Sequence, residues 1–180
     1  EQVHLVGRDE ASLSELAKEL NSTFTTCDVL EENFSEKIVN DLKDDQVNGL
    51  AYCVGSIDLK PLKLTKKSDF MQSFNLNLVS ATEIIKSLAD NLKASKGSIV
   101  LFSTVAVQQG FPNHAIVSSA KGAVEGLTLA LAAEYAPNIR VNCIAPSLTN
   151  SKISNFLLKN EKMAESIAKM HPLKRIGEGE

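Results

Sequence analysis

The sequence predicts an α/β fold in which a parallel sheet is covered by helices on both faces. Short apolar runs alternate along the whole chain with segments whose apolar residues recur at spacings of three and four. The runs are continuous rather than alternately apolar and polar, which is typical of parallel strands buried on both faces. This repeated strand–helix order predicts a three-layer, doubly wound sheet.

The strands are expected where an apolar run meets a turn-forming or polar residue. Gly7 follows the first run, Asp28 the second and Gly55 the third. The fourth run ends at a pair of hydroxyl residues, and Pro146 ends the last run because proline has no N–H for a sheet. The predicted strands cover residues 3–6, 24–27, 50–54, 98–102 and 139–145.

The helices are expected where apolar residues fall on one helical face. Asp9 can cap the first helix, whose core face would carry Leu13, Leu16, Ala17 and Leu20. The same spacing continues in the second, third and last helical segments, whereas the fourth is rich in small residues and is broken by a proline. After the first helix, the expected helices cover residues 34–42, 69–93, 117–136 and 152–170.

Composition is that of one soluble globular domain, so we expect residues 1–180 to form a single domain. The chain has 180 residues, of which 43% are hydrophobic and 23% charged. A net charge of −3 lacks the basic surface that binds nucleic acid or an anionic membrane. The apolar stretches fall short of the ~20 residues that a membrane span needs. We therefore expect neither nucleic acid nor a membrane as a partner.

The cysteines and histidines indicate no metal site. Cys27, Cys53 and Cys143 are far apart, and the three histidines are equally dispersed, so zinc-type spacing is absent. Unpaired thiols are typical of a reducing compartment, and no signal peptide is visible. We therefore expect a cytoplasmic protein.

The residues that follow the strands indicate function, because such folds bind ligands at the carboxyl ends of the strands. These positions carry an arginine, an aspartate, two hydroxyl residues and small residues. Four segments accompany them in order: NLNLVSATE, GSIVLFSTVA, SSAKGAVEGLTLALAAEYAPNIRVNCIAPS and HPLKRIGE. With this order and spacing the chain resembles the short-chain dehydrogenase/reductase family. The resemblance implies a Rossmann-type fold and an oxidoreductase that interconverts a carbonyl and an alcohol with NADP or NAD.

Arg8, Asp28 and Val29 are assigned by the resemblance to the adenosine end of the cofactor. A guanidinium after the first predicted strand suits the 2′-phosphate of NADP, whereas an NAD site usually presents an acid there, so NADP is favoured. Arg8 could equally be a solvated turn residue, and Asp28 could cap a helix that starts near Glu31. The resemblance also assigns three residues after later strands to the cofactor: Gly55, Pro146 and Thr149.

Lys121, Asn77 and Thr104 match the family's catalytic positions. In the family the lysine binds the nicotinamide ribose and lowers the pKa of a tyrosine; alternatively, Lys121 is a lysine at a helix start that reaches solvent. Asn77 matches an asparagine that stabilises a helix kink and a water beside that lysine, although Asn75 could align instead. Thr104 matches the substrate-orienting serine, with Ser103 adjacent, or is simply a capping hydroxyl at a strand exit.

Val117 stands four residues before Lys121, where the family has its general acid/base tyrosine. Valine has no proton to exchange. Tyr52 lies within a predicted strand and Tyr135 roughly 21 Å further along the helix, so neither is expected to replace it. His114 is the candidate replacement because the imidazole pKa is near ~6.5, although it could equally be an ordinary loop residue.

The departure at Val117 leaves two main hypotheses. The first is an oxidoreductase with a non-standard proton donor. The second is a catalytically silent relative that binds the nucleotide for sensing or scaffolding. A third, a relative in which only the fold persists, is disfavoured because Lys121 and Asn77 are retained.

The resemblance also implies that Glu1 is not the true start of the protein. The family's first strand and its Gly-rich, pyrophosphate-binding turn would lie upstream. That strand would run between the predicted strands at 3–6 and 50–54, which otherwise lack a partner between them. A last strand would follow Glu180. We therefore expect a dinucleotide-binding domain that is truncated at both ends.

A small-molecule substrate and a second copy of the chain are the expected partners. In the family, helices corresponding to residues 69–93 and 117–136 pair between subunits, which implies a homodimer or homotetramer. The segment 149–170 would form a mobile lid over the substrate.

Overall fold

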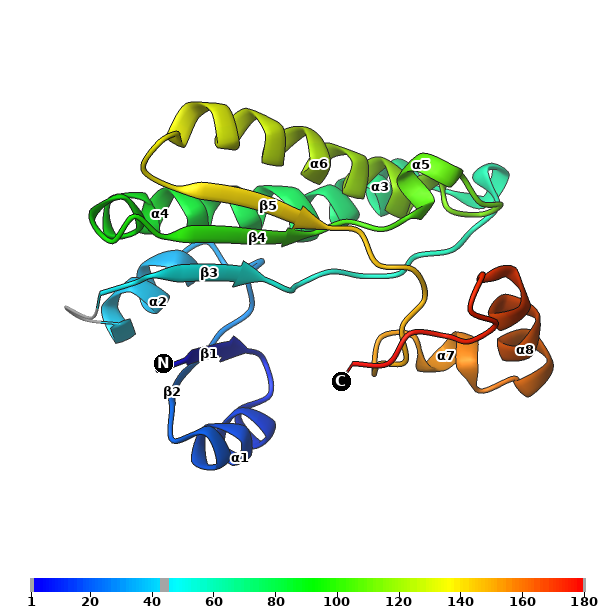
Figure 1. Ribbon diagram of the computed structural model, residues 1–180, viewed down its shortest axis with the longest axis horizontal. Helices are drawn as coiled ribbons and strands as arrows, with labels where there is room; N and C mark the ends of the chain where they lie inside the picture. Colours follow the sequence, from blue (N-terminus) through cyan, green and yellow to red (C-terminus); the bar gives the residue numbers. More distant parts are fainter. Residues whose placement is uncertain (1, 43–45, 180) are drawn as a thin grey trace.

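Strands and helices alternate along the chain, as the apolar pattern predicts (Figure 1). The computed structural model describes residues 2–42 and 46–179. The five strands are β1 (His4–Gly7), β2 (Thr23–Thr26), β3 (Gly49–Tyr52), β4 (Ser98–Phe102) and β5 (Arg140–Ile144).

The helices connect these strands in sequence order. Asp9 caps the first one as predicted, because its side chain accepts a hydrogen bond from the Ser12 N–H. The long helix predicted over 69–93 consists of two α-helices joined by the π-helical turn η2 (Asn75–Val79). The α-helices are α1 (Glu10–Leu20), α2 (Phe34–Leu42), α3 (Lys67–Phe74), α4 (Ser80–Ala94), α5 (Ala106–Gln109), α6 (Ala115–Tyr135), α7 (Asn155–Leu158) and α8 (Glu161–Met170); η1 (Leu62–Leu64) is a short 3₁₀-helix.

All strand pairs are parallel, and they form two sheets. β1 pairs with β2, while β3, β4 and β5 pair in that order with β4 in the centre. In the described part of the chain no strand pairing joins β1 to β3. This division falls where the resemblance places the family's first strand. The arrows of β1, β3, β4 and β5 point the same way in Figure 1, and β2 is parallel to β1, so the residues that follow the strands gather on one side.

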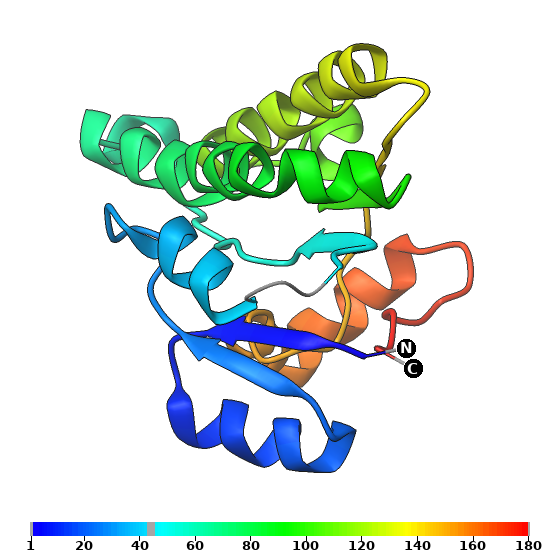
Figure 2. The same cartoon turned by 90° about the vertical axis from the view of Figure 1, so that its left-hand side faces the viewer.

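The helices lie on both sides of the sheets (Figure 2). α2, α4 and α6 lie on one side, and α1 packs against β1 and β2 on the other. The core forms where α4 and α6 meet the central strand. Its fully buried members include Ile85, Leu92, Ile99, Leu101 and Val124. The predicted α/β fold with a doubly wound, Rossmann-type parallel sheet is thus confirmed.

The expectation that every strand is buried on both faces is wrong for the outer strands. Ala51 of β3 and Val6 of β1 are exposed, and in the described residues neither strand has a partner on the edge that faces the other sheet. On β5, Val141 is buried whereas Ile144 is 48% exposed, since α6 covers a single face of this strand. β3 also ends at Tyr52, two residues before the predicted end at residue 54.

Three helix predictions also need correction. Leu16 and Leu20, expected in the core, are 41% and 50% exposed, because only one side of α1 meets the sheet. The helix predicted over 117–136 begins earlier, at Ala115. The segment predicted as one helix over 152–170 contains two, α7 and α8, which pack against each other.

α6 is long and apolar enough to cross a membrane by length and composition alone, with a mean hydropathy of 1.3. In this fold it instead covers β4 and β5 (Figure 1). Core helices of soluble proteins commonly meet the same criterion. The absence of a membrane partner stays a prediction.

Candidate cofactor and active site

Gly55, Asn77 and Lys121 meet just beyond the end of β3. A methyl group placed on Gly55 would lie 2.8 Å from Asn77 Oδ1 and 3.1 Å from Lys121 Nζ. Two polar atoms from α6 and η2 therefore converge on one point beside a backbone that carries no side chain. This close approach explains why a glycine stands at position 55.

The Lys121 side chain is buried in the first half of α6, with only 9% of the residue exposed. Burial lowers the pKa of its ammonium, and nearby Cys143 and Cys53 partly offset that effect. In the part of the chain that the structure describes, no carboxylate forms an ion pair with it. The alternative of a lysine that reaches solvent is therefore wrong for this structure, and the ammonium lies where a polar ligand would stabilise it.

Asn77 lies in the π-helical turn η2, and the other candidate, Asn75, is exposed. The Asn77 amide donates to the Ser73 carbonyl at 2.9 Å, which fixes its orientation. Its Oδ1 is buried and has no hydrogen-bond partner in the described residues. A buried acceptor without a partner is costly, so this oxygen also lies where a ligand or water could bond to it.

Val117 is buried one helical turn before Lys121, on the same face of α6. Neither tyrosine offers its hydroxyl there. The Tyr52 hydroxyl donates to the Leu76 carbonyl at 2.8 Å, and burial raises its pKa well above the ordinary range. Tyr135 is the last residue of α6, and the Lys93 ammonium lies 5.5 Å from the centre of its ring.

Thr104 and Ser103 follow β4, as expected, and each hydroxyl forms a hydrogen bond within the protein. Thr104 Oγ1 accepts a hydrogen bond from the Ala106 N–H at 3.3 Å, which is a turn contact two residues along the chain and not a helix cap, because the cap residue of α5 is Val105. Ser103 is buried, and its hydroxyl donates to Glu125 Oε1 at 2.6 Å. Of the two, the half-buried Thr104 is more accessible to a substrate.

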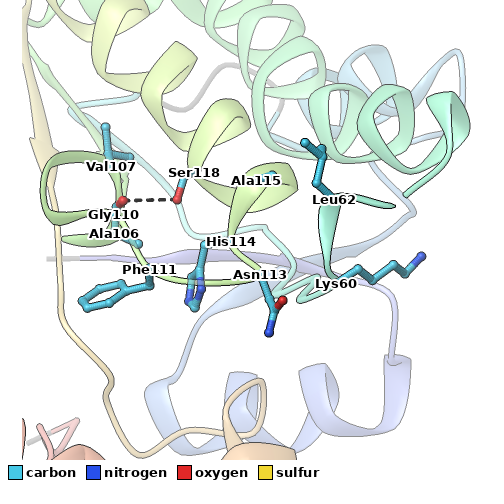
Figure 3. A pocket seen from close by; sticks show the side chains of 10 residues that line it. All are labelled: Lys60, Leu62, Ala106, Val107, Gly110, Phe111, Asn113, His114, Ala115 and Ser118. Carbon is cyan, nitrogen blue, oxygen red and sulfur yellow. Dashed lines mark hydrogen bonds between the residues drawn. The ribbon is translucent and has the colours of Figure 1, made fainter. Parts of the chain in front are cut away.

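His114 lies apart from the Lys121 cluster. It precedes the first residue of α6 and lines a cavity of about 320 Å³, together with Phe111 and Ser118 (Figure 3). Its Nδ1 lies 2.8 Å from the Pro112 carbonyl, and its ring lies 5.4 Å from that of Phe111. His114 thus lines this cavity, whereas Lys121 is not among the residues that line it.

Arg8 and Asp28, both assigned to the adenosine end, contact each other at the ends of β1 and β2. Arg8 Nη1 lies 3.5 Å from Asp28 Oδ2, and the Arg8 side chain is 77% exposed. Asp28 is not a helix cap, because α2 begins at Phe34; its carboxylate instead accepts from the Leu30 N–H. This is the tight turn typical of aspartate.

Val29 and Pro146 have structural contacts that fix the strand exits. The buried Val29 offers its carbonyl to the Ser80 hydroxyl of α4 at 2.8 Å. The Pro146 carbonyl accepts from the Val105 N–H at 3.2 Å, which holds the exits of β5 and β4 together. Thr149 begins the predicted lid and forms a single bridge to Gly177.

Two further contacts of this region were not predicted. Glu125 accepts a hydrogen bond from the Ser103 hydroxyl, and the helical spacing places Glu125 one turn after Lys121. Lys60 donates its N–H to the Asn113 carbonyl, and its ammonium pairs with Asp69 at 3.0 Å. Lys60 thereby joins the loop after β3 to the loop before α6, and no local pattern signals it.

Comparisons with known proteins identify the family to which the chain belongs. The family model described as enoyl-(acyl carrier protein) reductase matches residues 2–180. A tropinone reductase homologue of Arabidopsis thaliana is 34% identical over 187 aligned residues, which cover 98% of this chain and 71% of the relative. L-xylulose reductase of Bos taurus is 29% identical, with 99% of this chain and 74% of the relative covered.

Solved structures show the same fold. ElxO with NADP bound superposes with a TM-score of 0.87 at 26% identity, covering 98% of this chain and 75% of that one. A short-chain dehydrogenase/reductase from Brucella melitensis has a TM-score of 0.89 at 23% identity, covering 98% and 74%. The family match, the 34% identical relative and the shared fold show that this protein belongs to the short-chain dehydrogenase/reductase family of NAD(P)-dependent oxidoreductases.

Proposed function

We propose that this protein is an NAD(P)-dependent oxidoreductase that interconverts a carbonyl and an alcohol with a proton donor other than tyrosine. The observation that carries the proposal is the convergence of Lys121 Nζ and Asn77 Oδ1 on the space beside Gly55. Both atoms are buried polar groups without a charged partner in the described residues. They lie beyond the carboxyl end of a parallel strand, where dinucleotides bind in such folds.

These residues fit a ligand rich in hydroxyl groups. An ammonium donates three hydrogen bonds and a free amide oxygen accepts two, so a ribose diol can bond to both at once. The nicotinamide, when bound, supplies or accepts the hydride. Lys121 and Asn77 would hold and orient the ribose, and Gly55 would let the backbone approach it.

NADP is favoured over NAD in this proposal. The exposed Arg8 guanidinium has five N–H donors and stands at the exit of β1, where it can reach a phosphate. Asp28 pairs with it and would orient it. An Arg8→Ala variant is expected to lose affinity for NADPH while keeping that for NADH, as measured by fluorescence titration with both.

His114 is the proposed proton donor. The Pro112 carbonyl can only accept, so His114 Nδ1 carries a hydrogen and Nε2 is left for a substrate. When protonated, the imidazole would donate this second proton to the developing alkoxide. The cavity of about 320 Å³ beside it has apolar walls, including Phe111 and Val107, which suits a compact, largely apolar carbonyl compound.

A panel of aldehydes and ketones tests the proposal on the full-length protein with NADPH. We expect turnover that His114→Ala lowers by roughly 10²–10⁴-fold, the range for loss of a general acid. The exposed Ser119→Ala is the matched control on the same end of α6. Tight NADPH binding with no turnover, unchanged by His114→Ala, would refute the oxidoreductase.

Val117 favours a second candidate function for this protein. In it, the protein is a catalytically silent relative that binds the nucleotide for sensing or scaffolding. A buried valine beside Lys121 has no proton to give, and His114 lies outside the Lys121 cluster. A Val117→Tyr variant separates the two functions. Reductase activity gained only in that variant would indicate that the cofactor site is intact and the natural protein silent.

Self-association is part of the proposal. Gly126, Ala130 and Ala133 on α6 are exposed, and Leu129 between them is 74% exposed. Small residues let a second helix approach closely, so a second copy of the chain would cover this face in a homodimer or homotetramer. Light scattering at micromolar concentration should give an oligomeric mass.

A cytoplasmic location of the protein is also proposed. Fractionation of cells followed by detection of the protein tests it.

A further inference from the structure

Ser147 and His171 form a hydrogen-bonded pair, and neither residue lines the cavity beside His114. Ser147 Oγ lies 2.5 Å from His171 Nε2, although 24 residues separate them in the chain. His171 Nδ1 lies 2.9 Å from the Ile167 carbonyl. A carbonyl only accepts, so Nδ1 carries the hydrogen of the neutral ring. Nε2 is then an acceptor, and the Ser147 hydroxyl must donate to it.

A backbone framework holds the two residues in place. Ser147 follows Pro146 beyond β5, and His171 follows the last residue of α8. The two segments are joined because the Gly177 N–H donates to Leu148 at 3.1 Å and its carbonyl accepts from Asn150 at 2.8 Å. The serine hydroxyl is exposed while the imidazole is half-buried, so the nucleophile remains accessible.

The pair opens on a cavity of about 360 Å³. Its walls include the apolar side chains of Leu148, Leu173 and Ile176. Arg175 lines the same cavity and is exposed, with one guanidinium nitrogen 3.4 Å from a backbone carbonyl. Most of its N–H donors are therefore available to an anion.

We propose that Ser147 is the nucleophile and His171 the general base of an acyl-transfer site that accepts small carboxylic esters carrying an anionic group. A nucleophile within hydrogen-bond reach of a base, which a third group orients, is the arrangement that activates a serine. The Ile167 carbonyl is the orienting group here. The apolar walls would take the acyl chain, and Arg175 would bind the anionic group.

The chemistry needs no cofactor. Ser147 Oγ bonds to the ester carbonyl carbon as its proton passes to His171 Nε2. The carbon–oxygen bond to the leaving alcohol then breaks, and that oxygen takes the proton from His171. Water, deprotonated by His171, attacks the acyl-serine, which releases a carboxylic acid and restores the hydroxyl. The overall change is ester plus water to acid plus alcohol.

The para-nitrophenyl esters of acetate and of succinate (as its monoester), together with a fluorophosphonate probe, test this site on the full-length protein without dinucleotide. We expect the fluorophosphonate to label Ser147, as located by peptide mass spectrometry, and Ser147→Ala to abolish the label. His171→Gln should slow ester hydrolysis by about 100-fold, within the range of general-base catalysis. Arg175→Ala should abolish a preference for the succinate monoester over the acetate ester.

Ser151→Ala is the matched control, since Ser151 lies on the same segment and no imidazole contacts it in the described residues. It should react like the natural protein. Circular dichroism and a Ser147→Cys variant, which keeps a nucleophile and should still be acylated, guard against misfolding. Labelling at another residue, or equal rates in His171→Gln and the natural protein, would overturn the proposal. Because the assay contains no NADPH, this outcome is separate from that of the reductase test.

Discussion

Gly55→Ala is expected to weaken NADPH binding because the added methyl group enters the space on which Asn77 and Lys121 converge. It would lie 2.8 Å from Asn77 Oδ1 and 3.1 Å from Lys121 Nζ, whereas ordinary contacts are 3.4 Å or longer. Asn77 cannot move away freely, because its amide is bonded to the Ser73 carbonyl at 2.9 Å. Overpacking of this kind costs about 1–3 kcal/mol. If the bound state bears this cost, the dissociation constant rises by roughly 5- to 150-fold.

The assay is a titration of NADPH fluorescence with the full-length protein. Gly49→Ala is the matched control at the start of β3, where a methyl group would meet only Ser98 atoms at 3.7 Å and beyond. It should leave NADPH affinity within about twofold of the natural value, since surface changes are usually worth less than ~0.5 kcal/mol. If Gly55→Ala bound NADPH as tightly as Gly49→Ala, the cofactor would not occupy the space beside Gly55.

Three further variants probe the fold around the site. Burial lowers the folded-state pKa of Lys121, so the folded protein binds fewer protons than the unfolded one as pH approaches the ordinary lysine pKa. Without cofactor, Lys121→Met should therefore be more stable than the natural protein at neutral pH. This difference in the free energy of unfolding should shrink as the pH rises towards ~10.4. A difference that stays constant with pH in urea denaturation would contradict the prediction. Ser103→Ala removes a hydrogen bond of 2.6 Å to Glu125 and should lower the free energy of unfolding by about 1–2 kcal/mol. The control Ser119→Ala, whose hydroxyl bonds within its own helix, should change this free energy by under ~0.5 kcal/mol. Equal effects of the two substitutions would mean that the Glu125 contact contributes nothing. Leu129 is 74% exposed on the side of α6 that is proposed to face a second subunit, and Leu129→Glu introduces a charge there. Light scattering should then show dissociation to monomers. An unchanged oligomer would place the interface elsewhere.

Local sequence signals predicted the elements whose causes are local. The boundaries of β4 match the apolar run at 98–102, and α2 runs from Phe34 to Leu42 with Phe34 and Ile38 buried as its pattern requires. The cap at Asp9 formed because the donor that it binds lies three residues away. Lys121 was found because a lysine among small apolar residues is conspicuous in sequence.

Strand burial could not be predicted, because it depends on which strand or helix lies alongside. The apolar runs of β1 and β3 suggested buried strands, yet the two strands are unpaired edges toward each other in the described residues. On β5 a single helix covers one face, so Ile144 is left exposed. A run of apolar residues in the sequence shows that a strand is hydrophobic, but it does not show how many strands or helices pack against that strand.

The hydrogen-bonded pairs of polar side chains could not be predicted from the sequence either. Ser103 meets Glu125 across 22 positions, and Ser147 meets His171 across 24. Contacts of this kind are set by how strands and helices pack, and neither residue of a pair indicates the other. The alternative that Asp28 caps a helix was wrong for a related reason, since an aspartate after a strand suits a turn and a cap equally well in sequence.

A comparison of NADPH affinity between the natural full-length protein and Lys121→Met tests the central claim most directly. Hydrogen bonds from a charged group contribute about 1.5–3 kcal/mol, so the variant should bind NADPH roughly 10- to 150-fold more weakly. Lys86→Met, which removes an exposed lysine from α4, should bind as the natural protein does. Equal affinity of all three proteins would contradict the account, because the buried lysine would then have no part in holding the cofactor.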